Sequence, residues 1–196
     1  MEVQKLQRAS SLLWYTVEAI YVHAGTTQSS ADSGVVVSVT DVIVHDSFDE
    51  MAYTNDIALL KLAQPLSFSS TIQAVSLPSS GQQTSPGTTA TVVGWGTTES
   101  STSVASALLK VDAPVWSDAD CAATYEYYFM SPRETNICAG EANRGECGGD
   151  GGGPLLVNGQ QVGITSWGGY DCATADSPGV FTEVSNYVDW INQNAV

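Results

Sequence analysis

The most informative stretch of the chain reads Gly145-Glu-Cys-Gly-Gly-Asp-Gly-Gly-Gly-Pro154 and leads into the apolar run Pro154–Val157. Because glycine has no side chain beyond a hydrogen atom, the backbone N–H groups of such a loop can converge on one point. Convergent N–H groups bind an anion or a developing oxyanion. A glycine-rich turn without a ligand is the alternative interpretation. Either way, the stretch predicts a tight loop that feeds a β-strand.

Short apolar segments rich in β-branched residues precede and follow this loop. They are bounded by Gly, Pro, Asn and Asp, the residue types that form turns. The predicted strands are Gly34–Val39, Val42–Val44, Asp56–Leu62, Ala90–Trp95, Leu108–Val111, Pro154–Val157, Gln161–Trp167 and Gly179–Val184. Asn158-Gly159 predicts a hairpin turn between two of them. Many short strands at regular spacing predict an all-β sandwich or barrel.

One helix is predicted, at the end of the chain. Val184, Tyr187, Val188 and Ile191 recur at helical spacing and form a single apolar stripe. The first thirty residues show no clear period. The Ser/Thr-rich segment Thr97–Ser106 predicts a loop between two halves that meet near residue 100. A chain of 196 residues is expected to form a single domain, 1–196, of two closely packed halves.

Composition excludes two classes of partner. The chain has 6 Lys and Arg against 21 Asp and Glu, a formal net charge of −15. So few and scattered basic residues cannot follow a phosphate backbone, so we expect no nucleic-acid partner. The chain has no run of about eighteen apolar residues, which excludes a membrane-spanning helix, and we expect no membrane partner. Hydrophobic residues make up 43% of the chain, enough for a sizeable core.

The four cysteines all lie in the second half, at Cys121, Cys138, Cys147 and Cys172. Four cysteines allow three pairings, and spacing does not choose among them. The Cys-x-x-Cys spacing of a metal or redox site is absent and the two histidines are remote, so we expect no metal. Two disulfides are the better interpretation, and they favour a secreted, extracellular protein. The apolar patch Leu12–Val17 is interrupted by Glu18, so a signal peptide is not evident.

Five segments in order resemble the chymotrypsin/trypsin-type serine proteases. They are Asp56-Ile-Ala-Leu-Leu-Lys-Leu62, Val93-Gly-Trp-Gly96, Thr135-Asn-Ile-Cys-Ala-Gly140, Gly149-Asp-Gly-Gly-Gly-Pro-Leu155, and Ser166-Trp-Gly168 with Pro178-Gly-Val-Phe-Thr182. The resemblance runs from about Val22 to the end. It implies two packed antiparallel β-barrels and a C-terminal helix. The first barrel, about 22–100, is expected to be incomplete after an atypical start at 1–21, and the second spans about 101–196.

The resemblance also implies a catalytic triad, of which one member is recognisable. A serine attacks the substrate carbonyl, a histidine takes its proton and a buried aspartate orients the histidine. Asp56 is similar to that aspartate, whereas Gly151 stands where the nucleophile is expected. The Ala-Ala motif that precedes the family's histidine is absent. His23 resembles a position in the strand that follows the catalytic histidine, and His45 resembles a surface position, so neither is expected to be the base.

The remaining site residues are implied by the same resemblance. The backbone of Gly149 and Gly151 would form the oxyanion hole, and Asp150 would pair with a freed N-terminal ammonium that this chain lacks. Without that cation we expect Asp150 to turn out to solvent. The specificity pocket comprises Gly145, Glu146, Ser166, Trp167, Gly168 and Gly179. Glu146 is expected either to meet a basic side chain there or to face solvent. The implied disulfides are Cys121–Cys138 and Cys147–Cys172.

Two functions remain open. The first is a catalytically inactive homologue, a pseudoprotease that binds peptide or protein segments, with no cofactor. The alternative is a secreted serine endopeptidase, digestive or processing, represented by a truncated or altered sequence. An incomplete first barrel has unpaired strand edges, which promote aggregation or recruit another chain. We therefore also expect association through these edges.

Overall fold

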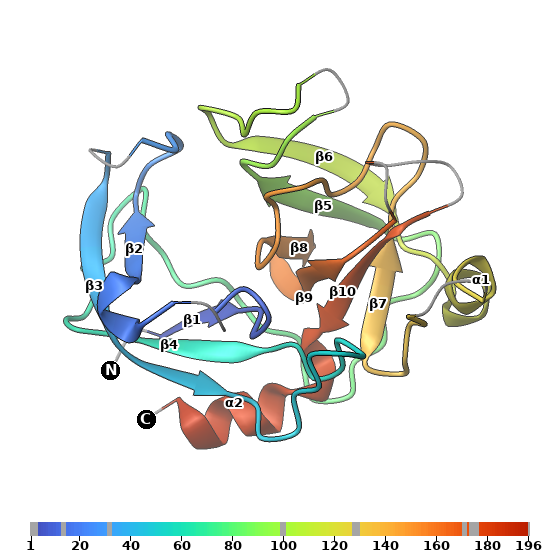
Figure 1. The fold of residues 1–196 in the computed structure, drawn as a ribbon, viewed down its shortest axis with the longest axis horizontal. Coiled ribbons are helices and arrows are strands. Elements are labelled where there is room, and N and C mark those ends of the chain that lie inside the picture. Colours follow the sequence, from blue (N-terminus) through green and yellow to red (C-terminus); the bar gives the residue numbers. More distant parts are fainter. Residues whose placement is uncertain are drawn as a thin grey trace.

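The computed structural model describes residues 4–12, 15–30, 33–98, 101–126, 130–169, 172 and 177–195. They form two curled antiparallel sheets that stand side by side, with a helix at the C-terminal end beneath them (Figure 1). The first sheet contains four strands and the second six. This arrangement confirms the predicted all-β fold of the trypsin-like type, with its C-terminal helix.

The first sheet has the strand order β1-β4-β3-β2. Its strands are β1 (Gln4–Gln7), β2 (Tyr21–Ala24), β3 (Val35–Val44) and β4 (Ala58–Leu62). The two segments predicted around Asp41 form one strand, β3, whose register against β4 shifts between Val39 and Asp41. A shift of this kind is a β-bulge, which bends the strand and curls the sheet. The first thirty residues show no clear period, yet β1 and β2 lie there.

The second sheet has the order β6-β5-β8-β9-β10-β7. Its strands are β5 (Thr89–Gly94), β6 (Leu109–Pro114), β7 (Asn136–Ala139), β8 (Pro154–Val157), β9 (Gln160–Trp167) and β10 (Gly179–Glu183). Val115, just after β6, bridges to Ala139 of β7, and this bridge closes the sheet into a barrel. Asn158 and Gly159 both have positive φ and join β8 to β9, which confirms the predicted hairpin.

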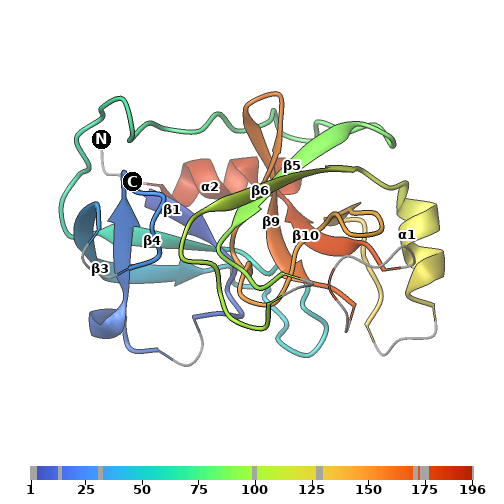
Figure 2. The same ribbon diagram turned by 90° about the horizontal axis from the view of Figure 1, so that it is seen from above.

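The helices are short. The chain has single 3₁₀ turns at η1 (Val17–Ala19) and η2 (Val184–Asn186), and α-helices at α1 (Asp118–Thr124) and α2 (Val188–Asn194). The predicted apolar stripe is split between η2 and α2. Val184, Tyr187 and Ile191 are buried in one cluster with Ile57 and Leu59 of the first half. The C-terminal helix therefore packs on the first sheet and ties the chain end to it (Figure 2).

The chain crosses from one sheet to the other between Leu62 and Thr89, not near residue 100. β5 already belongs to the second barrel. The Ser/Thr-rich segment instead forms a loop that returns to the first half. Gln28 bridges to Ala107, and the Trp95 indole N–H donates to the Thr27 carbonyl at 3.0 Å. The Ser/Thr-rich segment suggested a boundary because it is polar. Polarity alone does not report which sheet the flanking strands join.

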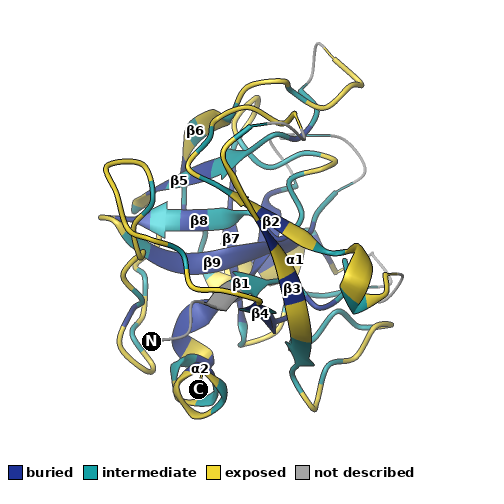
Figure 3. Ribbon diagram, turned by 90° about the vertical axis from the view of Figure 1, so that its left-hand side faces the viewer, coloured by how far each residue is buried: buried dark blue, intermediate teal, exposed yellow. Residues whose placement is uncertain are grey.

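Figure 3 shows exposed segments in both β2 and β3. The exposed residues of these strands include apolar side chains. Tyr21 is 57% and Val36 44% exposed, and β2 has a strand neighbour on one side only among the described strands. Such an edge is a template for pairing with another chain. We expect the double variant Tyr21→Lys, Val36→Glu to lower the average mass in multi-angle light scattering toward that of one chain.

Met51→Lys is the matched control, because Met51 is 81% exposed but lies in a loop away from this edge. It should leave the average mass unchanged. An unmodified chain that is already monomeric at micromolar concentration would contradict the association predicted through the strand edges.

Candidate functional site

Asp56 lies in the loop before β4, where the two sheets meet, and is completely buried. Its carboxylate accepts three hydrogen bonds. Ser10 donates from its backbone N–H at 2.7 Å and from its hydroxyl at 2.8 Å, and the Ser166 hydroxyl donates at 2.6 Å. A buried carboxylate requires such donors because desolvation penalises an unpaired charge. The Asp56 carboxylate thus joins three parts of the chain: the loop before β4, the segment after β1, and β9 of the second sheet.

No imidazole reaches this carboxylate. His23 lies in β2 and is exposed. The ring of His45 packs against Tyr187 and Trp190, with ring centroids 5.4 and 5.1 Å apart. Burial lowers the pKa of His45, an effect that Asp46 opposes. Both histidines therefore lie outside the site, as expected, and Asp56 has no general base to orient.

A cation lies at Gly151, the position at which the resemblance implies a nucleophile. The guanidinium of Arg8 lies directly over Gly151, so that a Cβ atom on Gly151 would collide with it. Its Nη1 donates to the Ser166 carbonyl at 2.5 Å, while its Nε is buried without a partner. Sequence reasoning missed both Arg8 and Ser10, because a four-residue strand flanked by polar residues has no detectable period.

Arg8 also borders a cavity of about 260 Å³. Its lining includes both predicted oxyanion-hole residues, the disulfide Cys147–Cys172 and the end of β9. The backbone N–H groups of Gly149 and Gly151 donate to no acceptor among the described residues. The cavity walls are Arg8, Glu146, Cys147, Gly148, Gly149, Gly151, Ser166, Trp167, Gly168, Gly169 and Cys172. The structure therefore brings together every predicted pocket residue except Gly145 and Gly179 at the lining of one cavity.

Glu146 points into the protein, so the solvent-facing alternative is wrong. Its side chain fills the space beside Gly168 and Gly179, since a Cβ atom on either glycine would collide with it. Burial raises the pKa of Glu146 to about 7; Asp150 adds to this increase and Arg8 opposes it. At neutral pH this carboxyl group is therefore divided between its two protonation states.

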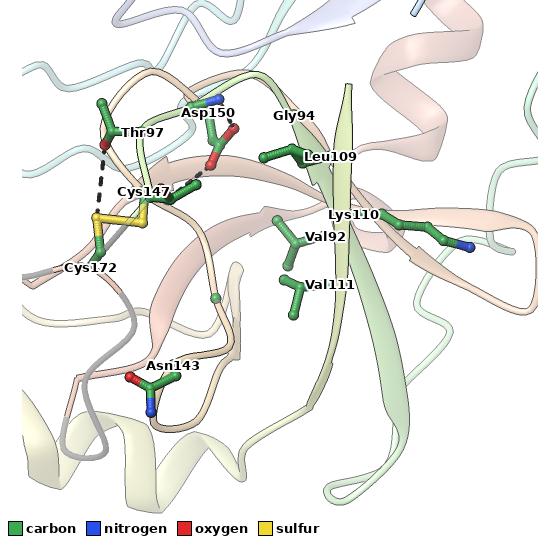
Figure 4. A pocket seen from close by; sticks show the side chains of 13 residues that line it. Val92, Gly94, Thr97, Leu109, Lys110, Val111, Asn143, Cys147, Asp150 and Cys172 are labelled. Atoms are coloured by element: carbon green, nitrogen blue, oxygen red, sulfur yellow. Dashed lines mark hydrogen bonds between the residues drawn. A yellow bond between two sulfur atoms is a disulfide. The ribbon is translucent and has the colours of Figure 1, made fainter. Parts of the chain in front are cut away.

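Asp150 is not turned out to solvent either. Its carboxylate accepts hydrogen bonds from the backbone N–H of Gly96 at 2.7 Å and of Cys147 at 2.9 Å. Gly94 and Gly96 have no Cβ, and any Cβ there would collide with this carboxylate. Asp150 also lines a second cavity, of about 260 Å³. In Figure 4 it lies at one end of this cavity, and Val92, Leu109 and Val111 form the apolar side. Backbone donors thus bind the carboxylate for which the resemblance implies an ammonium partner.

The two disulfides join Cys121 to Cys138 and Cys147 to Cys172. The first pins α1 to β7, and the second holds the glycine-rich loop at the cavity. Among the described residues, no group of three His, Cys, Asp or Glu side chains is placed to hold a metal ion. No described helix is both long and apolar enough to cross a membrane.

Comparison with known proteins identifies the family. The trypsin family model matches residues 14–191. The chain belongs to the trypsin family. It is 38% identical over 181 residues to trypsin beta of Drosophila erecta, covering 92% of this chain and 70% of that protein. It is 41% identical over 160 residues to trypsin of Sus scrofa, covering 80% of this chain and 67% of that protein. It is 42% identical over 160 residues to cationic trypsin-3 of Rattus norvegicus, and this match covers 80% of this chain and 62% of that protein.

The family match begins after the segment that fills the site. Arg8 and Ser10 precede residue 14, so they lie outside the part of the chain that matches the trypsin model. Asp56, Ser166 and the glycine-rich loop lie inside it. The two groups of residues meet because β1 pairs with β4, with Gln7 opposite Ala58, and this places the residues after β1 beside Asp56.

The raised pKa of Glu146 predicts a pH-dependent stability. Because the pKa in the folded chain, about 7, is above the usual 4.5, the folded chain binds the proton more tightly. The corresponding stabilisation is complete below about pH 4.5 and is lost as pH rises through about 7. Burial also raises the pKa of Glu183 to about 7, opposed by its hydrogen bond from Asn186. Glu146→Gln should therefore remove part of the fall in Tm between pH 5 and pH 8, measured by circular dichroism.

Glu50→Gln provides the control, because Glu50 is exposed in the loop before β4. It should keep the full fall in Tm. A Glu146→Gln chain whose Tm falls as much as that of the unmodified chain would contradict a raised pKa of Glu146 in the folded chain.

Proposed function

We propose that this chain is a member of the trypsin family that binds peptides and does not cleave them. The observation that carries the proposal is the state of the Asp56 carboxylate. Its donors are Ser10 and Ser166, with no imidazole, and Gly151 has no oxygen with which to form an acyl-enzyme. In serine-protease triads, removal of the serine or the histidine costs about 10⁶ in kcat.

The surface that suits a peptide is the end of β9 with the cavity beside it. An extended peptide can pair with free main-chain groups that continue beyond a strand. Arg8 already occupies the Ser166 carbonyl, whereas Gly168 borders the cavity. Glu146 presents its carboxyl group beside Gly168, which supports a preference for a basic ligand side chain. A bound ammonium or guanidinium group would favour the ionised form of Glu146.

We also propose that the protein works outside the cell. Two disulfides are stable in an oxidising compartment and rare in the cytosol. Within the described residues all four cysteines are paired. This agrees with a secreted protein and depends on the disulfides alone.

The test combines an activity probe with a cleavage assay. The chain is treated with a fluorophosphonate, which labels an activated serine, and then incubated with denatured casein for mass spectrometry, with a commercial trypsin as positive control. We expect neither labelling nor cleavage. Labelling of a peptide that contains Ser10 or Ser166, or the appearance of new casein fragments, would overturn the proposal and favour the active endopeptidase.

A further inference from the structure

Arg8 carries a positive charge that forms no ion pair with the described residues; its interaction with Glu146 lowers the pKa of that carboxyl group without a direct contact. Within the described part of the chain its guanidinium makes one hydrogen bond, to the neutral carbonyl of Ser166, and its buried Nε has no hydrogen-bond partner there. Among the described residues no carboxylate lies within ion-pair distance of it. A partly buried guanidinium without a counterion is costly, since desolvation of a charge is offset only by pairing. The site is therefore short of one negative charge.

The neighbouring acidic groups do not supply it. Asp56 directs its carboxylate oxygens to Ser10 and Ser166, and Asp150 directs its oxygens to Gly96 and Cys147. Glu146, the remaining carboxyl group on the cavity wall, is turned toward Gly168 and Gly179. Among the described residues no carboxylate pairs with Arg8, so an anion from a ligand would complete the site.

The cavity also provides two neutral donors next to Arg8. The N–H groups of Gly149 and Gly151 have no acceptor within the described part of the chain. They belong to the same cavity wall as the guanidinium, which lies over Gly151. A planar guanidinium and convergent backbone N–H groups are the donors that proteins use for carboxylates. An uncharged peptide carbonyl would satisfy the N–H groups but would leave the guanidinium without a counterion.

We propose that Arg8, together with the backbone N–H groups of Gly149 and Gly151, binds the free C-terminal carboxylate of a peptide whose last residues lie along Ser166–Gly168. This inference rests on the proposed function and names its ligand: a peptide end, not a continuous chain. A C-terminal carboxylate supplies the missing charge and ends the ligand at Arg8, where a chain that continued would meet the guanidinium. Glu146 adds a preference for a basic last residue.

The experiment compares matched peptides by fluorescence anisotropy at low ionic strength. The peptides are fluorescein-labelled Ala-Ala-Ala-Lys with a free carboxylate, the same peptide as its C-terminal amide, and Ala-Ala-Ala-Asp as its C-terminal amide. We expect the free carboxylate to bind about ten- to a hundredfold more tightly than the Lys amide, the range for a charge-assisted hydrogen bond. Equal affinities of the two Lys peptides, or binding of the Asp amide as tight as that of the carboxylate, would overturn the assignment to a peptide C-terminus.

Variants of Arg8 test whether this residue binds the ligand carboxylate or only blocks the cavity. If Arg8 binds the carboxylate, Arg8→Ala reduces affinity for the free-carboxylate peptide to that for the amide, and Arg8→Lys restores part of the difference. If Arg8 merely fills the site, Arg8→Ala raises affinity for both peptides, which would overturn the proposal. Arg133→Ala, an exposed cation outside the cavity wall, should change neither affinity.

The outcomes also separate this inference from the proposed function. Cleavage of any of the peptides, seen by mass spectrometry after the titration, contradicts the proposed function itself. Equal binding without cleavage contradicts only the carboxylate site. The comparison of carboxylate with amide uses the unmodified chain, so it remains decisive if Arg8→Ala does not fold.

Discussion

A chain that combines Arg8→Ala, Ser10→His and Gly151→Ser is expected to hydrolyse peptide amides, whereas Gly151→Ser alone stays at the rate of the unmodified chain. Both the backbone N–H and the hydroxyl of Ser10 already reach the Asp56 carboxylate, so a histidine at this position can place its imidazole on it. The backbone at Gly151 is not left-handed, so a serine fits once the Arg8 guanidinium is gone.

The expected gain follows from the role of a general base. A positioned base contributes about 10²–10⁴ in rate, so the triple variant should exceed Gly151→Ser by at least about 10² in kcat/KM. A fluorogenic Lys amide measures it. The chain with Arg8→Ala and Gly151→Ser but without Ser10→His is the matched control and should stay inactive. Hydrolysis by Gly151→Ser alone would contradict the geometry, because it would require a base that the structure does not place at the site.

The second large effect concerns stability. Asp56→Ala is expected to lower the free energy of unfolding by about 3–5 kcal/mol, since the Ser10 N–H and the hydroxyls of Ser10 and Ser166 lose a charged acceptor inside the protein. The same carboxylate links the segment after β1 to β9 of the second sheet. Urea denaturation followed by tryptophan fluorescence gives the value.

Two further variants serve as comparisons for the stability loss of Asp56→Ala. Asp56→Asn keeps the size of the side chain and one acceptor oxygen, so its loss should be smaller than that of Asp56→Ala. Glu50→Ala removes an exposed carboxylate from the preceding loop and should change stability by less than about 0.5 kcal/mol. A loss below about 1 kcal/mol for Asp56→Ala would mean that water reaches the site and replaces the carboxylate.

Strand prediction succeeded best for the apolar strands β8, β9 and β10. Pro154–Val157 has the bounds predicted from its apolar run, and β9 and β10 each differ from prediction by one residue at one end. It failed for β1, β2 and β7. β1 combines Gln and Lys with one leucine, and it forms because β4 offers it a pairing edge. The polar asparagine at the start of β7 is buried and donates to the Phe181 carbonyl. Neighbouring strands stabilise such segments, and local propensity does not report neighbours.

The helix α1 was also missed, although its start carries a recognisable signal. The Ser117 hydroxyl accepts from the Asp120 N–H at 3.1 Å, a helix N-cap. The helix is only seven residues long, and Cys121 is its buried anchor in the disulfide to Cys138. A helix this short has no full apolar stripe, so periodicity cannot find it.

The sequence by itself determined what this protein lacks. Glycine at position 151 has no nucleophilic oxygen in any conformation, and the identity of a residue needs no fold to be read. The five family segments likewise lie within short, locally patterned stretches. Only the tertiary structure decided which residues lie at these positions: Arg8 over Gly151, and Ser10 on the Asp56 carboxylate. Arg8 reaches Ser166 across 158 positions and Ser10 reaches Asp56 across 46. Contacts at such separations depend on strand pairing and on how two sheets meet, and no local period encodes them.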